Sequence, residues 1–231
     1  MTQKPDDISG KQAAYYGGLY EKHGASVDAV ASGLQVYKNL RYEKLSAVFA
    51  RDSSCSVHDV GFGLGHYHEF IKSAYPDKSV DYSGSEVTPH FVEHCRQVYP
   101  DGAFFLRDLS TSPSPERYDY FIFGGTFYHL AGSAPHDFQQ FMERMLSNAF
   151  ASADRGIAFN VITGYSDFRS EDLFYADLPA VLEFVVGKLS RFFTIDHAAP
   201  LYEYTVCVYR EEYISRVHPD AAYNKYFKTR R

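Results

Sequence analysis

The sequence predicts an α/β protein with a seven-stranded, mainly parallel sheet, an antiparallel final strand and helices on both faces. Three observations support this prediction. Short β-branched or aromatic runs alternate with helical patterns from residue 57 onward, which is typical of strand–helix–strand units. A glycine-rich turn, DVGFGLG, joins the first of these runs to the first helical pattern. The 231 residues, 45% of them hydrophobic, are enough for one well-buried core, so we expect a single domain over 1–231.

The elements follow in a regular order. Helical patterns without a strand pattern fill residues 1–50, so we expect a helical cap over one end of the sheet. The core is expected over 51–210, with a lid insertion at about 164–185 and a tail at 211–231. Strands are predicted at 56–60, 79–83, 103–106, 118–123 and 156–162, and helices at 65–75, 88–98, 135–152 and about 176–190. The runs RFFTIDHA and YEYTVCVYR predict an antiparallel pair that closes the sheet.

Composition argues against several classes of protein. The net charge of −6 disfavours a nucleic-acid binder, because such proteins normally carry an excess of Lys and Arg. No apolar run reaches the roughly 18 residues that span a membrane, and the first dozen residues are polar, so neither a membrane segment nor a secretory signal is expected. Three widely spaced cysteines without a C-x-x-C pair favour the cytoplasm and give no reason to expect a metal site. We expect a monomer or a homodimer.

The turn DVGFGLG indicates a ligand that approaches the backbone closely. In an open α/β sheet, ligands bind beyond the carboxyl ends of the strands, where this turn lies. A dinucleotide fingerprint would need a glycine at position 66, which is His66, whereas Gly61, Gly63 and Gly65 give the pattern G-x-G-x-G. A tight turn that only needs positive φ remains an alternative.

Four motifs in order make the sequence similar to the class I S-adenosylmethionine-dependent methyltransferases, in their small-molecule branch. They are DVGFGLG, DYSGSEV, FLRDLS and YDYFIFGGTFYHL, and the resemblance extends from about Tyr15 to Tyr209. It implies a Rossmann-like class I methyltransferase fold, S-adenosyl-L-methionine as the cofactor and enzyme activity.

The resemblance also assigns cofactor contacts. Glu86 would accept hydrogen bonds from the ribose hydroxyls, although an exposed loop acid is an alternative. Asp108, with Leu109, would contact the adenine, and a turn-capping role for Asp108 is nearly as well supported. Asp59 would hold backbone amides of the glycine turn and lie near the cofactor's ammonium. Gly124 would line the methyl-donor site.

The amino-terminal helices complete the expected cofactor site. In similar proteins, aromatic residues of the first helix cover the sulfonium, a role that Tyr15, Tyr16 and Tyr20 match. An Arg of the next helix pairs with the methionine carboxylate, which Arg41 matches because its planar fork binds a carboxylate bidentately. An exposed helical charge is the alternative for Arg41.

The catalytic and substrate contacts rest on fewer signals. His129 is the candidate base, because a neutral imidazole titrates in a suitable range, and Tyr128 and Tyr16 would assist it at the reacting centre. A backbone-bonded helix start is the alternative for His129. The residues expected to enclose the substrate are aromatic or polar and lie in or near the lid: Tyr20, Asn160, Tyr165, Phe168 and Tyr175. The alternative role of the aromatic ones is packing within the lid.

Three functions follow from these residues. The first is methyl transfer from S-adenosylmethionine to nitrogen, oxygen or sulfur of a small metabolite, as part of specialised biosynthesis. The second is a cyclase reaction, in which the cofactor's own amino group attacks its γ-carbon to give azetidine-2-carboxylate and methylthioadenosine. The third is non-catalytic binding of the cofactor. Nucleic-acid methylation is disfavoured by charge and by GGTF, which stands where such enzymes carry an N-P-P-Y-type tetrad.

Overall fold

Every strand and helix predicted for the core is present in the computed structural model, which describes residues 7–30 and 33–228. The few residues of the predicted cap and tail at 1–6, 31–32 and 229–231 lie outside the described part. The strands are β1 Ser54–Val60, β2 Ser79–Glu86, β3 Ala103–Leu106, β4 Tyr118–Phe123, β5 Ala153–Thr163, β6 Tyr175–Ala176, β7 Phe193–Asp196 and β8 Glu203–Tyr209. The helices are α1 Ile8–His23, α2 Gln35–Ser46, α3 His66–Ala74, α4 Pro89–Val98, α5 Pro135–Ser152, α6 Leu178–Phe184 and α7 Glu211–Val217, with shorter turns η1 Val27–Val30, η2 Ala47–Phe49, η3 Val185–Leu189 and η4 Ala221–Tyr226.

The sheet has the order β3-β2-β1-β4-β5-β8-β7. Pairing is parallel from β3 through β5, and β8 runs antiparallel to both β5 and β7. The predicted mainly parallel sheet with an antiparallel closing pair is confirmed. One strand was missed: the two-residue β6 pairs with the end of β5, which makes the sheet eight-stranded. Two residues are too few for an alternating pattern to indicate a strand.

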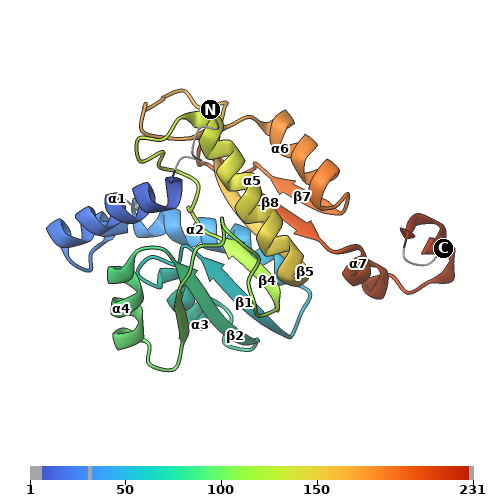
Figure 1. Ribbon diagram of the computed structural model, residues 1–231. Coiled ribbons are helices and arrows are strands. Elements are labelled where there is room, and N and C mark those ends of the chain that lie inside the picture. Colours follow the sequence, from blue (N-terminus) through green and yellow to red (C-terminus); the bar gives the residue numbers. More distant parts are fainter. Residues whose placement is uncertain (1–6, 31–32, 229–231) are drawn as a thin grey trace.

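Helices cover both faces of the sheet, as predicted (Figure 1). One hydrophobic cluster joins α5 and α6 to β4 and β5 through large residues such as Phe121, Phe159 and Met142. A second cluster joins α2, α3 and α4 to the opposite face through Tyr120, Ile122 and other buried side chains. Successive residues of β4 therefore belong to alternate clusters, which is the expected result of side-chain alternation along a strand.

The first 50 residues form helices, as expected, and Figure 1 shows α1 (dark blue) beside the carboxyl ends of the central strands. Helix α1 packs on η1 and α4, whereas α2 contacts β5 and β8. Within the expected tail at 211–231, residues 211–217 form the helix α7, which lies beyond the end of the sheet that is away from α1 (Figure 1). Two acids, Glu211 and Glu212, lie in the first turn of α7, where they interact favourably with the helix dipole.

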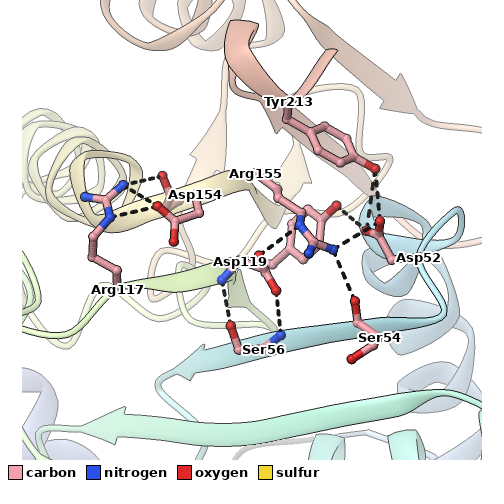
Figure 2. Close-up of polar contacts among 10 residues, drawn as sticks. Asp52, Ser54, Ser56, Arg117, Asp119, Asp154, Arg155 and Tyr213 are labelled. Atoms are coloured by element: carbon pink, nitrogen blue, oxygen red, sulfur yellow. Dashed lines mark hydrogen bonds and ion pairs between the residues drawn. The ribbon is translucent and has the colours of Figure 1, made fainter. Parts of the chain in front are cut away.

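An ion-pair network fastens the amino ends of three strands (Figure 2). The guanidinium of Arg155 on β5 lies 2.8 Å from a carboxylate oxygen of Asp119 on β4 and 3.1 Å from one of Asp52, just before β1. Asp119 also accepts a hydrogen bond from the backbone N–H of Ser56, and the Tyr213 hydroxyl of α7 points at Asp52. This network lies at the edge of the sheet opposite the carboxyl ends of the parallel strands.

All three cysteines are free and buried. Burial raises the pKa of each thiol to about 12: Cys55, Cys95 and Cys207. None of the helices within the described residues is long and apolar enough to span a membrane.

Candidate functional site

A cavity of about 210 Å³ lies at the carboxyl ends of the central strands. Its walls come from α1, α2, the glycine turn after β1, the ends of β2 and β3, the loop after β4, and α5. Eight predicted site residues line it: Tyr16, Arg41, Gly61, Gly63, Glu86, Gly124, Tyr128 and His129. The other predicted site residues are not in the lining: Tyr15, Tyr20, Asp59, Gly65, Asp108, Leu109, Asn160, Tyr165, Phe168 and Tyr175.

The glycine turn needs its glycines for backbone reasons as well as for space. Gly61, Gly63 and Gly65 have φ of +77°, +54° and +77°, a conformation that L side chains rarely adopt. Gly61 and Gly63 line the cavity, whereas Gly65 faces α4, where a Cβ would lie 2.6 Å from the ring of Tyr99. The first two glycines therefore serve the cavity, and the third serves helix packing.

Glu86 is the last residue of β2 and points its carboxylate at the glycine turn. It accepts hydrogen bonds from the backbone N–H groups of Gly63 at 3.2 Å, Val87 at 2.7 Å and Thr88 at 3.0 Å. Burial raises the pKa of Glu86, and these three bonds act in the opposite direction. Oε1 accepts two of these bonds and Oε2 accepts one, so Glu86 can still accept from a ligand hydroxyl through Oε2.

Asp59 has a different environment from the one expected. It was expected to hold amides of the glycine turn, but its recorded side-chain hydrogen bond comes from the Tyr82 hydroxyl at 2.7 Å. The side chain is 2% exposed, and burial raises the pKa of Asp59 to about 7. Alternation along β1 turns Asp59 towards the cluster under α2 and α3 rather than into the cavity.

In the loop after β3, Arg107 lines the cavity, whereas the expected residues Asp108 and Leu109 do not. Asp108 accepts a hydrogen bond from the backbone N–H of Ser110 at 2.7 Å, which is the turn-capping alternative. Leu109 is 1% exposed and packs in the hydrophobic cluster with α5. Arg107 lines the cavity instead, and its guanidinium pairs with Glu116 at 2.6 Å.

Residues of α1 reach the cavity at a spacing of four. Gln12 and Tyr16 line it, because residues four apart share one face of a helix. Tyr15 is rotated away and is 37% exposed, and its hydroxyl lies 3.4 Å from Nδ1 of His129. Tyr20 stacks on the ring of His90 of α4, at a centroid distance of 5.4 Å.

His129 follows β4 and is held on several sides. The Gln12 side-chain amide donates to its backbone carbonyl at 2.5 Å, and the Tyr15 ring stacks on the imidazole at 5.2 Å. Burial lowers the pKa of His129, with the charge of Asp172 acting in the opposite direction. The imidazole is therefore neutral near pH 7 and can accept a proton.

A polar network lies behind Arg41 and Tyr128. The Nε of Arg41 donates to Glu203 of β8 at 3.0 Å, and the guanidinium lies 5.0 Å from the centre of the Tyr128 ring. The Asn160 side-chain amide donates both to Glu203 and to the Tyr128 hydroxyl. Glu203 was not predicted from the sequence, and the acid in YEYTVCVYR is the only local signal for it.

The lid aromatics lie away from the cavity. Tyr165 and Phe168 are 70% and 75% exposed, and the Tyr175 ring lies 5.2 Å from the Arg169 guanidinium. The backbone of the lid does reach the site, because Leu173 forms an isolated β-bridge with His129. The described residues contain no group of three or more His, Cys, Asp or Glu side chains that could hold a metal ion.

Comparison with known proteins agrees with the architecture. No protein-family model matches the sequence. The chain is 26% identical over 155 residues to the Mycobacterium tuberculosis protein named "Putative methyltransferase Rv1506c", covering 66% of this chain and 92% of that protein. Magnesium protoporphyrin IX methyltransferase from Synechocystis PCC 6803, with bound SAM, superimposes with a TM-score of 0.60 over 90% of this chain and 100% of that one, at 14% identity. The chain has the class I methyltransferase fold.

A second solved structure of this methyltransferase fold has a different substrate. The 1,6-didemethyltoxoflavin N1-methyltransferase of Burkholderia thailandensis, with bound 1,6-didemethyltoxoflavin and S-adenosylhomocysteine, gives a TM-score of 0.61 at 14% identity. The match covers 91% of this chain and 92% of that one. The resemblance inferred from the four sequence motifs is thus confirmed at the level of the fold.

Proposed function

We propose that the protein is an S-adenosylmethionine-dependent methyltransferase that acts on a small-molecule acceptor. One observation carries the proposal: Glu86, Arg41 and the first two glycines of the turn, Gly61 and Gly63, border a single cavity at the carboxyl ends of the strands. The relative in Mycobacterium tuberculosis supports the activity. The Burkholderia thailandensis neighbour, with bound 1,6-didemethyltoxoflavin and S-adenosylhomocysteine, shows that this fold can hold a small molecule together with the cofactor product. A role in specialised biosynthesis belongs to the same proposal.

The residues of the cavity fit this cofactor chemically. Oε2 of Glu86 can accept from a ribose hydroxyl, and an arginine such as Arg41 binds a carboxylate. Tyr16 presents an aromatic ring, which attracts a positively charged group such as a sulfonium. Gly61 and Gly63 leave their backbone open to the cavity.

Catalysis by these residues would consist mainly of alignment. The cofactor, when bound, supplies a methyl group on positively charged sulfur. Glu86 and Arg41 would fix the ligand, while the buried aromatic walls exclude water, so that the acceptor attacks in line with the methyl–sulfur bond. His129 would take the acceptor's proton as general base, with Tyr15 orienting its ring through the contact at Nδ1. Tyr128 would hydrogen-bond the ligands from the same wall.

Product analysis tests the proposal. The protein is incubated with methyl-labelled S-adenosylmethionine and a panel of phenols, amines and thiols, and products are identified by mass spectrometry. A labelled acceptor with stoichiometric S-adenosylhomocysteine supports methyl transfer. Methylthioadenosine with an equal amount of azetidine-2-carboxylate, formed without any acceptor, would instead establish the cyclase reaction, and binding without product would establish a non-catalytic binder.

A matched pair of glycine variants checks that the cavity is the site. Gly61→Val adds a side chain at φ +77°, with its Cβ 3.0 Å from Thr126, and should abolish S-adenosylhomocysteine binding in calorimetry. Gly187→Val is the control, because a Cβ at Gly187 meets nothing within 4 Å. Unchanged affinity in a folded Gly61→Val variant would refute the assignment of the site.

A further inference from the structure

Glu203 is a buried acid that touches the cavity only through other residues. It is 7% exposed at the start of β8, and its two carboxylate oxygens lie 3.3 and 3.0 Å from Nε of Arg41. Glu203 engages Arg41 through Nε, and no other residue in the described part of the chain accepts a hydrogen bond from the two terminal nitrogens of the guanidinium. Arg41 lines the cavity, so these nitrogens can serve a ligand there.

The orientation of the Asn160 amide is fixed by two independent partners. Its Oδ1 accepts a hydrogen bond from the backbone N–H of Gly125 at 2.8 Å, so its Nδ2 faces the other way, towards Glu203 and Tyr128. A carboxylate such as Glu203 can only accept, which agrees with this orientation. Both amide hydrogens of Asn160 are therefore used.

This arrangement decides which hydrogen bond Tyr128 can make to a ligand. Its hydroxyl already accepts a hydrogen from Asn160 Nδ2, so the hydroxyl's own proton is directed elsewhere. Among the described residues, no acceptor for that proton is recorded, and Tyr128 lines the cavity. Tyr128 is thereby set as a hydrogen-bond donor towards the cavity.

We propose that Glu203 and Asn160 are positioning residues that set Arg41 and Tyr128 as paired donors for one carboxylate, the α-carboxylate of the cofactor's amino-acid end. The inference rests on the proposed function and extends it to two residues that do not line the cavity. Two donors on one wall suit a carboxylate, which has two acceptor atoms, and do not suit an ammonium, which has none. The stacking of Arg41 over the Tyr128 ring at 5.0 Å keeps the two donors together.

The test compares two ligands that differ at the amino-acid end. S-adenosylhomocysteine carries the carboxylate, whereas 5′-methylthioadenosine keeps the adenosine and the sulfur but lacks the amino-acid group. Calorimetry should show that Glu203→Gln weakens S-adenosylhomocysteine binding about tenfold, the loss of one good hydrogen bond. Binding of methylthioadenosine should stay within about twofold, because adenosine does not reach Glu203's partners in this scheme.

A matched control and a milder variant complete the design. Asp196→Asn removes another acid that pairs with a cation of α2, since Asp196 of β7 lies 2.7 Å from Lys44, and it should alter neither affinity. Tyr128→Phe removes one hydroxyl and should lower only S-adenosylhomocysteine affinity, which keeps the test available if Glu203→Gln does not fold.

Three results would overturn the inference. Equal losses for both ligands would show that Glu203 only supports the fold. Unchanged S-adenosylhomocysteine binding would show that Arg41 needs no positioning, and tighter binding would show that Glu203 merely neutralises Arg41. Failure of the wild-type protein to bind either ligand would instead refute the proposed function, so the two failures are distinguishable.

Discussion

The buried carboxyl group of Asp59 should make stability fall as the pH rises. Burial raises its pKa from 3.8 to about 7 in the folded protein, so the folded state holds this proton more tightly than the unfolded state does. A difference of about 3 pKa units corresponds to ~4 kcal/mol at about 1.4 kcal/mol per unit. The free energy of unfolding should therefore carry a cost that is absent below pH 3.8, grows between pH 3.8 and about 7, and is constant above that.

The variant Asp59→Asn isolates the free-energy cost of ionising Asp59, because it keeps an acceptor for the Tyr82 hydroxyl but cannot ionise. Urea unfolding of both proteins at several values between pH 4.5 and 8 gives the difference directly, since every other titrating group is shared. About 1 kcal/mol of the cost is already present at pH 4.5, so the variant should gain ~3 kcal/mol over the wild type between pH 4.5 and 8. A constant offset from the altered hydrogen bond does not affect the slope. Parallel curves for the two proteins would refute the reasoning.

Two further predictions concern the site and the base of the sheet. Glu86→Ala should weaken S-adenosylhomocysteine binding by about 1.5–3 kcal/mol, because it removes hydrogen bonds to a charged group, and an unaltered dissociation constant would move the ribose contact elsewhere. Arg155→Met leaves Asp52 and Asp119 without their shared cation, and the three side chains are between 14% and 25% exposed. The loss in urea unfolding should lie between the ~1 kcal/mol of an exposed pair and the ~3–5 kcal/mol of a buried one, with ligand affinity of the folded protein unchanged.

The strands and helices of the core could be predicted because their signals are local. Hydrophobic periodicity distinguishes a strand from a helix within one window of sequence, and the parallel order follows from their alternation. Helix α7 also has a local signal, the two acids in its first turn, but no helix was predicted within the tail at 211–231. The two-residue β6 has no periodicity to detect.

The site residues were predicted less completely, because whether a residue lines the cavity depends on the direction in which its side chain points. Tyr15 and Tyr16 are equivalent in the sequence, but neighbouring residues of a helix point about 100° apart, and Tyr16 faces the cavity. A search at a spacing of four would have paired Tyr16 with Gln12. After β3, the Asp108 carboxylate accepts a hydrogen bond within the turn, and the Leu109 side chain is buried in the hydrophobic core. Arg107 is the residue of this loop that lines the cavity.

Glu203 could not have been predicted from local pattern. It lies 162 positions from Arg41 in the sequence and 43 from Asn160. The antiparallel pairing of β8 with β5 brings it to Asn160, and the packing of α2 on β8 brings it to Arg41. In the sequence it is one acid in an otherwise apolar strand. Its contacts depend on the register between two strands, which the sequence of either strand does not specify.

The three buried thiols have a practical consequence for following ligand binding by fluorescence. Thiol-reactive dyes attack thiolates, and with pKa values of about 12 none of the native cysteines would compete with a surface cysteine introduced by mutation. The sequence also contains no tryptophan, so a single tryptophan placed at Phe168, in the exposed lid, would emit without background from a native tryptophan. The protein therefore offers a background free of reactive native thiols and of native tryptophan, on which the environment of one label in the lid can be followed.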